Sequence, residues 1–140
     1  MVGITSYVDV NIFVYWLGNH PLLGKTAYEW IKKIEIAPKG EYITSSLTLY
    51  ETLVIIAGLT GRSLKDKRLV EDIINAMTHL KGLLIDSLTP EDLIQAVELM
   101  KEYGIDYEDS IHLTVALRKG AKEIVSNDKD FDSTRLRRNF

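Results

Sequence analysis

The chain has no cysteine among its 140 residues. Disulfide bonds, thiolate zinc sites and thiol nucleophiles are therefore excluded. A chain without disulfides suits a reducing compartment, and we expect a cytoplasmic protein. Any chemistry has to be carried by other side chains.

Proline is scarce as well, with 3 residues, and no Pro/Gly-rich linker, repeat or low-complexity tract divides the sequence. We therefore expect a single domain over residues 1–140. No apolar run approaches the ~20 residues that span a bilayer, so we expect no membrane partner. The N-terminus lacks the basic leader of a secretion signal.

Neither sign of charge dominates, since the net charge is only −3. If four of the 20 acidic residues bind metal, the other 16 are balanced by 17 Lys and Arg residues. The bases form three clusters: Arg62, Lys65, Lys67 and Arg68; Arg118, Lys119 and Lys122; and Arg135, Arg137 and Arg138. The distribution of charge therefore matters more than its sum. We expect the last cluster to be a solvated tail, with an RNA contact as the alternative.

Short β-branched segments alternate with segments of helical periodicity. We expect strands at 4–10, 41–45, 83–86 and 123–126, and helices at 11–17, 22–36, 46–57, 63–80, 90–103 and 109–119. Ser46 is the expected N-cap of the third helix. Leu93, Val97 and Met100 are expected to face the core from the fifth helix. The alternation predicts an α/β fold in which helices cover both faces of a parallel sheet.

Four carboxylates stand in unusually apolar surroundings. Asp9 is the only charged residue among residues 1–24, and Glu51 is the only one between Glu41 and Arg62. Glu51 lies in a segment, LTLYETLVIIAGL, that is apolar nearly all round and therefore expected to be buried. Asp109 begins the apolar stretch DSIHLTVAL, and Asp128 follows the strand segment EIVSN.

Several carboxylates that converge on one cleft repel each other, and no basic residue lies close to them in the sequence. A hard divalent cation with oxygen ligands stabilises such a cluster; Mg²⁺ fits best and Mn²⁺ would be tolerated. Each acid also has a simpler explanation. Asp9 and Asp128 are typical turn or cap residues, and Asp109 is a plausible helix N-cap. Glu51 would need a buried basic partner.

The ordered set YVDVNIFVYW, Glu51 after TSSLTLY, YEDSIHLTVAL and EIVSNDKDF resembles PIN-domain nucleases, and within them the VapC-type toxins of toxin–antitoxin pairs. The resemblance covers essentially the whole chain. It implies a PIN-like three-layer α/β/α sandwich with a central, mostly parallel sheet of four to five strands. It also implies that the four acids are the metal ligands and catalytic residues, and that the accessory positions are Asn11, Ser126 and Asp130. Ser126 stands where the family commonly has Thr and keeps the hydroxyl. Asp130 is either an accessory ligand or, as we favour, a surface residue.

The implied activity is metal-dependent hydrolysis of RNA phosphodiester bonds, with Mg²⁺ or Mn²⁺ as cofactor. If two ions are used, Asp9 is the expected bridging ligand. The implied partners are an RNA substrate, a cognate antitoxin and a second copy of the chain, with the helices at 49–59 and 63–80 as candidate dimer surfaces. An RNA-processing nuclease and a catalytically restrained protein-binding module remain as alternatives.

Other phosphate-handling folds fit less well. A haloacid-dehalogenase phosphatase would need a second Asp at the position of Asn11, and no dinucleotide or Walker glycine loop is present. The three histidines lack zinc-ligand spacing. His112 lies three residues after Asp109 and could approach the cleft, but its apolar neighbours favour a packing residue.

Overall fold

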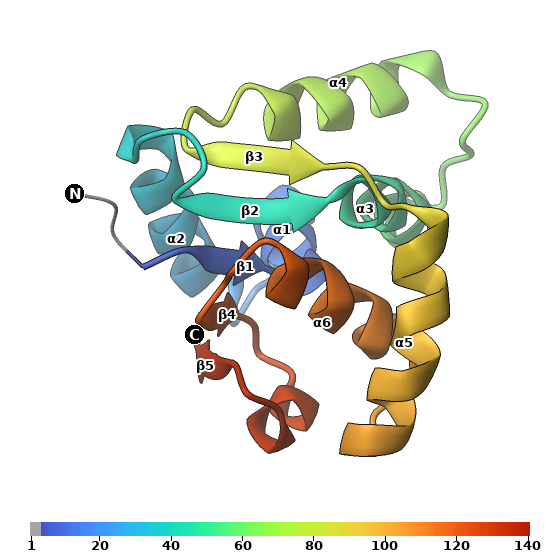
Figure 1. Ribbon diagram of the computed structural model, residues 1–140. Coiled ribbons are helices and arrows are strands. Elements are labelled where there is room, and N and C mark those ends of the chain that lie inside the picture. Colours follow the sequence, from blue (N-terminus) through green and yellow to red (C-terminus); the bar gives the residue numbers. More distant parts are fainter. Residues whose placement is uncertain (1–3) are drawn as a thin grey trace.

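The computed structural model describes residues 4–140 (Figure 1). The elements in chain order are β1 (Ser6–Val8), α1 (Val10–Leu17), α2 (Gly24–Ile36), β2 (Tyr42–Ser45), α3 (Ser46–Thr60), α4 (Lys67–Thr78), β3 (Leu83–Asp86), α5 (Pro90–Tyr103), α6 (Tyr107–Arg118), β4 (Glu123–Val125), the 3-10 turn η1 (Lys129–Ser133) and β5 (Arg137–Asn139). Among these residues, no helix is both long and apolar enough to cross a membrane.

The strands form one five-stranded sheet in the order β3-β2-β1-β4-β5, and each neighbouring pair is parallel. Tyr7 at the centre of β1 pairs with Ile43 on one side and Ile124 on the other. The expected parallel α/β sheet is confirmed. All carboxyl ends of the strands meet at the same edge, where ligands bind in such sheets.

The basic tail was expected to be a solvated end, and the side chains of Arg135 and Arg137 are indeed exposed, but the backbone of the tail belongs to the sheet. Arg137–Asn139 forms β5, which pairs with β4 along its full length. Leu136 is buried just before the strand, and Arg137 forms an ion pair with Glu123 of β4. The strand was not predicted because a three-residue strand has no periodicity to detect, and backbone pairing with β4 supplies its hydrogen bonds. Charged side chains on such an edge strand also oppose further strand pairing.

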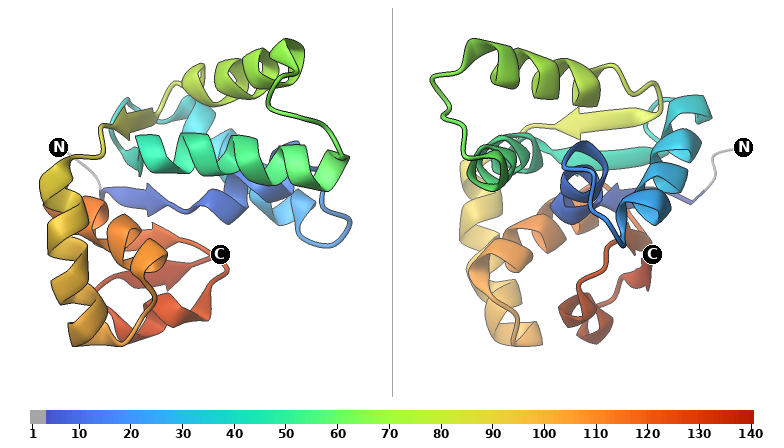
Figure 2. Two further views of the ribbon diagram at one scale, coloured as in Figure 1. Left: turned by 90° about the vertical axis from the view of Figure 1, so that its right-hand side faces the viewer. Right: turned by 180° about the vertical axis from the view of Figure 1, so that it is seen from behind.

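Helices cover both faces of the sheet, which gives the three layers (Figures 1 and 2). Consecutive side chains of a strand point to opposite faces. Val8 therefore packs into a core with α1, α2, α3 and α4, whereas Tyr7 packs into a second core with α5, α6 and η1. Seen from behind, α1 and α2 lie in front of the sheet (Figure 2).

Two helix starts differ from the expected positions. Ser45, not Ser46, caps α3, because its side chain accepts a hydrogen bond from the Thr48 amide. Asp106, not Asp109, caps α6 and accepts a hydrogen bond from the Asp109 amide at 2.8 Å. Asp109 therefore lies within the first turn of α6, and capping no longer explains its side chain.

The apolar residues of α3 and α5 are less buried than their sequences suggested. The expected core residues of α5, Leu93, Val97 and Met100, are exposed, and Ala96 and Leu99 pack inward instead. In α3, Tyr50 and Leu59 are exposed although the helix is apolar nearly all round. The two helices lie on the same side of the molecule (Figure 2, left). This side therefore carries more apolar surface than the core requires.

Candidate metal centre

The four predicted acids lie on elements that begin at the carboxyl edge of the sheet. Asp9 directly follows β1 and caps α1, and Asp128 follows β4 and caps η1. Glu51 lies in α3, which begins directly after β2. Asp109 enters from the first turn of α6. Strand polarity and short connections therefore bring residues from four parts of the chain to one region.

Asp9 is almost fully buried, with 4% of its surface exposed. One carboxylate oxygen accepts a hydrogen bond from the Val10 amide at 2.8 Å, and the other accepts one from the Ser126 hydroxyl at 2.6 Å. The same hydroxyl oxygen accepts a hydrogen bond from the Asp128 amide at 2.9 Å. Ser126 thus joins the loop after β4 to the acid after β1.

Asp109, Asp128 and Asp130 form a group whose carboxylate oxygens lie within 4.8 Å of one another. Asp130 is exposed, and its amide donates to Asp128 at 2.9 Å. We had favoured a surface residue at this position. Asp130 is at the surface, and its carboxylate also lies within reach of a cation held by the other two.

The electrostatics of this group show how unfavourable the carboxylates are together. Burial raises the pKa of Asp9, and the Asp128 carboxylate raises it further, against the opposing effect of His112 and two hydrogen bonds. Burial together with the charges of Asp128, Asp106 and Asp9 raises the pKa of Asp109 to about 7. A divalent cation would reverse this repulsion and favour the ionised form of both acids.

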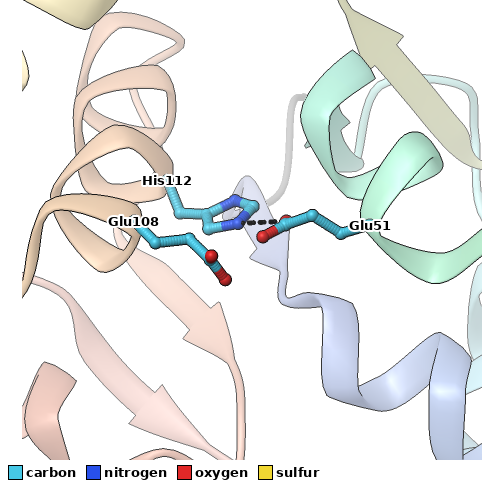
Figure 3. Close-up of side chains that lie close together, drawn as sticks. All are labelled: Glu51, Glu108 and His112. Carbon is cyan, nitrogen blue, oxygen red and sulfur yellow. Dashed lines mark hydrogen bonds and ion pairs between the residues drawn. The ribbon is translucent and has the colours of Figure 1, made fainter. Parts of the chain in front are cut away.

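Glu51 lies in a second group with Glu108 and His112, whose ligand atoms are also within 4.8 Å of one another (Figure 3). His112 Nε2 lies 2.7 Å from Glu51 Oε1. The buried partner that Glu51 requires is therefore a histidine on α6, distant in sequence. We had favoured packing for His112 over an approach to the cleft; the side chain is buried, and it also contacts Glu51.

The pKa values of this second group diverge. Burial raises the pKa of Glu51, but hydrogen bonds from His112 and Glu108 outweigh this effect and lower it. The hydrogen bond with Glu51 and partial burial raise the pKa of Glu108 to about 7. Burial lowers the pKa of His112, yet Tyr7 and the carboxylates of Glu51 and Asp9 outweigh burial and raise it well above its usual value.

His112 connects the two groups electrostatically, because it interacts with both Glu51 and Asp9. Beside it, Glu51 and Glu108 line a cavity of about 280 Å³ with apolar walls from Leu47, Tyr50, Val54 and Ile55. The sequence did not single out Glu108 as a site residue. Its position one residue before Asp109 was the only available signal.

The residues present fit a divalent cation. Their donors are carboxylate oxygens, which hard cations prefer, and burial together with repulsion between the carboxylates raises the pKa values of Asp9 and Asp109. Asn11 adds a further oxygen two residues after Asp9: its side-chain Oδ1 is buried and finds no hydrogen-bond donor among residues 4–140. Such an atom is costly to bury unless something outside the chain satisfies it.

The comparisons with known proteins agree with this architecture. The family model of the PIN domain matches residues 6–136. The fold is similar to that of the Mycobacterium tuberculosis toxin VapC20, described as cleaving the sarcin-ricin loop, with a TM-score of 0.72, 18% identity and coverage of 95% of this chain and 99% of the toxin.

It is also similar to a chain of the Rickettsia felis VapBC2 complex, solved with a DNA fragment from its promoter, with a TM-score of 0.68 and 19% identity. That match covers 97% of this chain and 98% of the other. A toxin–antitoxin complex from Klebsiella pneumoniae matches with a TM-score of 0.67 and 19% identity, covering 91% and 90% of the two chains. A search of curated proteins found no match. Because the family model spans nearly its full length, the chain belongs to the PIN domain family.

Proposed function

We propose that this chain is a divalent-metal-dependent endoribonuclease and the toxin of a VapBC-type toxin–antitoxin pair. The observation that carries the proposal is the convergence of Asp9, Asp109 and Asp128 at the carboxyl edge of the sheet. Burial, together with the charges of Asp128, Asp106 and Asp9, raises the pKa of Asp109 to about 7. Carboxylates gathered in this way are suited to hold Mg²⁺ or Mn²⁺.

The ligands of the proposed centre are Asp9, Glu51, Asp109 and Asp128, with Asn11, Ser126 and Asp130 as accessory residues. When bound, a divalent cation supplies an activated water and neutralises charge that develops on the phosphate. The protein contributes position. Asp9 is held by two hydrogen bonds, and Asp128 is anchored through its amide to the same hydroxyl that binds Asp9.

Arg138 supports an RNA contact beside this centre. Its guanidinium donates to the Ser126 carbonyl at 3.4 Å and to Asp132. The hydrogen bond with Asp132 raises the pKa of Arg138, and the Asp128 carboxylate adds to this effect. A cation next to the acidic group would offset their repulsion of an approaching phosphate. Arg62 and Arg118 are also paired, with Asp66 and with Asp86 and Asp92. Arg138 is set apart by its contact with Ser126, the residue that binds Asp9.

The proposed partners are an antitoxin and a second copy of the chain, in the cytoplasm. The antitoxin is supported by the fold's similarity to chains of toxin–antitoxin complexes. For the dimer, the exposed apolar residues favour α3 together with α5: Tyr50, Val54, Leu59, Ile94 and Val97. They favour α4 less, because its outward residues include Lys67, Arg68 and Glu71.

The test compares wild type, Asp9→Asn and the control Glu98→Gln on a panel of structured RNAs with Mg²⁺, Mn²⁺ or EDTA. Glu98 is an exposed acid of α5 that pairs only loosely with Lys101, at 3.7 Å. We expect wild type and Glu98→Gln to cleave RNA when metal is present. The cleavage rate of Asp9→Asn should be lower by at least about 100-fold, since removing one essential group has effects of this size. Cleavage that survives both EDTA and Asp9→Asn would refute the mechanism. Absence of cleavage by wild type would favour a protein-binding module.

The toxin role needs a separate measurement. Induced expression of wild type should arrest growth of a bacterial host, whereas Asp9→Asn should not. RNA cleavage without growth arrest would favour an RNA-processing nuclease over a toxin.

A further inference from the structure

We propose that His112 is a positioning residue that holds the Glu51 carboxylate in place as a metal ligand, and that Tyr7 in turn holds the His112 ring. The proposal rests on the proposed function, because it takes Glu51 as one of the ligands. It adds two residues, one from β1 and one from α6, to the structure that supports the centre.

The three side chains form a continuous hydrogen-bonded chain through the protein interior. His112 Nε2 lies 2.7 Å from Glu51 Oε1, and His112 Nδ1 lies 2.6 Å from the Tyr7 hydroxyl. Tyr7 is fully buried and His112 is 1% exposed. Their rings meet edge to face, with centroids 5.7 Å apart. Figure 3 shows the imidazole of α6 pointing at the Glu51 carboxylate of α3.

The proton arrangement follows from the partners. An ionised carboxylate can only accept a hydrogen bond, so the proton between His112 and Glu51 resides on Nε2. This holds for the neutral and the protonated ring alike. The Tyr7 hydroxyl can donate to Nδ1 or accept from it, and therefore fixes the ring orientation in both states.

Glu51 needs such a support more than the aspartates do. Its side chain has three rotatable bonds, and it extends from a helix whose neighbours are apolar. Asp9 and Asp128, by contrast, are held next to the backbone that they cap. Residues that orient a metal ligand commonly change metal affinity or activity by about 10- to 100-fold when removed. The short contact from His112 is suited to that role.

A matched pair of substitutions separates positioning from packing. In His112→Gln the amide nitrogen can reach the place of Nε2 and donate to Glu51. In His112→Asn it can reach only the place of Nδ1, so the contact with Tyr7 is retained and that with Glu51 is lost. His79→Asn is the control, because His79 is an exposed histidine that contacts only its own helix, at Asn75.

The first measurement is Mn²⁺ affinity by calorimetry, with thermal unfolding of the metal-free proteins recorded alongside. We expect His112→Asn to weaken Mn²⁺ binding about tenfold. The Mn²⁺ affinity of His112→Gln should stay within a few-fold of wild type, and that of Tyr7→Phe should lie between the affinities of the two His112 variants. Wild-type affinity in His112→Asn would overturn the proposal. So would equal losses in His112→Asn and His112→Gln that follow their melting temperatures, since that pattern belongs to packing alone.

The second measurement needs neither metal nor activity. Proton–nitrogen correlation spectra of the wild-type protein should show a slowly exchanging proton on His112 Nε2, with the ring nitrogen signals shifted in Tyr7→Phe. A ring without a protected Nε2 proton would overturn the proposal whatever the protein's activity. If the proton is present and Mn²⁺ binds but no RNA is cleaved, the proposed ribonuclease function fails while the positioning role stands.

Discussion

Ser126 connects two acids of the proposed centre through one oxygen. Its hydroxyl donates to Asp9 and accepts from the Asp128 amide. Ser126→Ala removes both hydrogen bonds, and we expect Mn²⁺ affinity and RNA cleavage to fall by about tenfold, as for other residues that orient metal ligands. Titration calorimetry and single-turnover cleavage would measure the two effects.

Ser126→Thr is the matched control for this change, because it keeps the hydroxyl. It should retain most of the affinity and activity that Ser126→Ala loses. Equal behaviour of the alanine and threonine variants would show that the hydroxyl does not organise the centre.

The raised pKa of Asp109 makes the stability of the metal-free protein depend on pH. Its folded pKa of about 7 lies above the ordinary value of 3.8, so the folded chain holds the proton more tightly than the unfolded chain. The resulting stability is fully present below the ordinary value and is lost as pH rises through 7. The metal-free protein should therefore melt at a lower temperature at pH 8 than at pH 5.

Asp109→Asn should weaken this pH dependence and raise the free energy of unfolding at pH 8 by on the order of 1 kcal/mol. The gain is small because the half-buried site is partly screened by solvent. Glu108, whose pKa is also raised to about 7, titrates in the same range, so Glu108→Gln is the necessary companion variant. Mg²⁺ should restore the wild-type melting temperature at pH 8 and affect Asp109→Asn less. An unchanged pH dependence in both variants would contradict the proposed repulsion.

At the scale of the element, the start of α6 depends on Asp106. Its carboxylate accepts the Asp109 amide hydrogen bond at 2.8 Å, satisfying a donor that the helix cannot satisfy itself. Asp106→Ala should lower the free energy of unfolding by about 1 kcal/mol. Asp106→Ser keeps a capping oxygen and should lose only a fraction of this.

Urea unfolding of the metal-free protein measures both variants. The two changes also separate capping from charge, because both remove the Asp106 carboxylate but only one removes the cap. If alanine and serine cost the same, the cap is not what stabilises this helix start.

Several element bounds were readable from local sequence pattern. The helix expected at 90–103 is α5, which begins after a capping box formed by Thr89 and Asp92, and β3 has its predicted bounds. The sequence did not indicate which apolar residues of α5 face the core, because the helix has more apolar residues than are buried. Ala96 and Leu99 take the buried positions, and the larger residues Ile94 and Val97 are left outside.

At the scale of the whole molecule, Arg118 joins three elements at one point. Its guanidinium donates to Asp86 at the end of β3, to Asp92 in the first turn of α5 and to the Ser87 carbonyl between them. Asp92 is only 2% exposed, so its charge depends on this partner. The Arg118 side chain thereby fixes the end of α6 against the edge of the sheet.

Arg118→Ala should destabilise the protein by about 2–3 kcal/mol, because it leaves a buried carboxylate without its cation. The double variant with Asp92→Asn should recover part of that loss, whereas Lys101→Ala, which removes an exposed partner of Glu98, should change little. Chemical denaturation of wild type, the single variants Arg118→Ala and Asp92→Asn and their double variant completes the cycle. A loss below about 0.5 kcal/mol for Arg118→Ala would place this arginine among ordinary surface residues.

The amino-acid sequence alone was enough to predict the alternation of strands and helices, the parallel sheet and the edge at which Asp9, Asp109 and Asp128 meet. Each of these follows from local periodicity and from the polarity of parallel strands, which act over a few residues at a time. The identification of these acids as metal ligands stays a prediction, tested by the experiments above.

The contacts that these side chains make became visible only in the folded molecule. Glu51 meets a histidine 61 positions away, and that histidine meets Tyr7 across 105 positions. No local pattern encodes such contacts, because they depend on how α3, α6 and β1 pack together. The same holds for β5, a three-residue strand that forms because β4 offers it an unpaired edge.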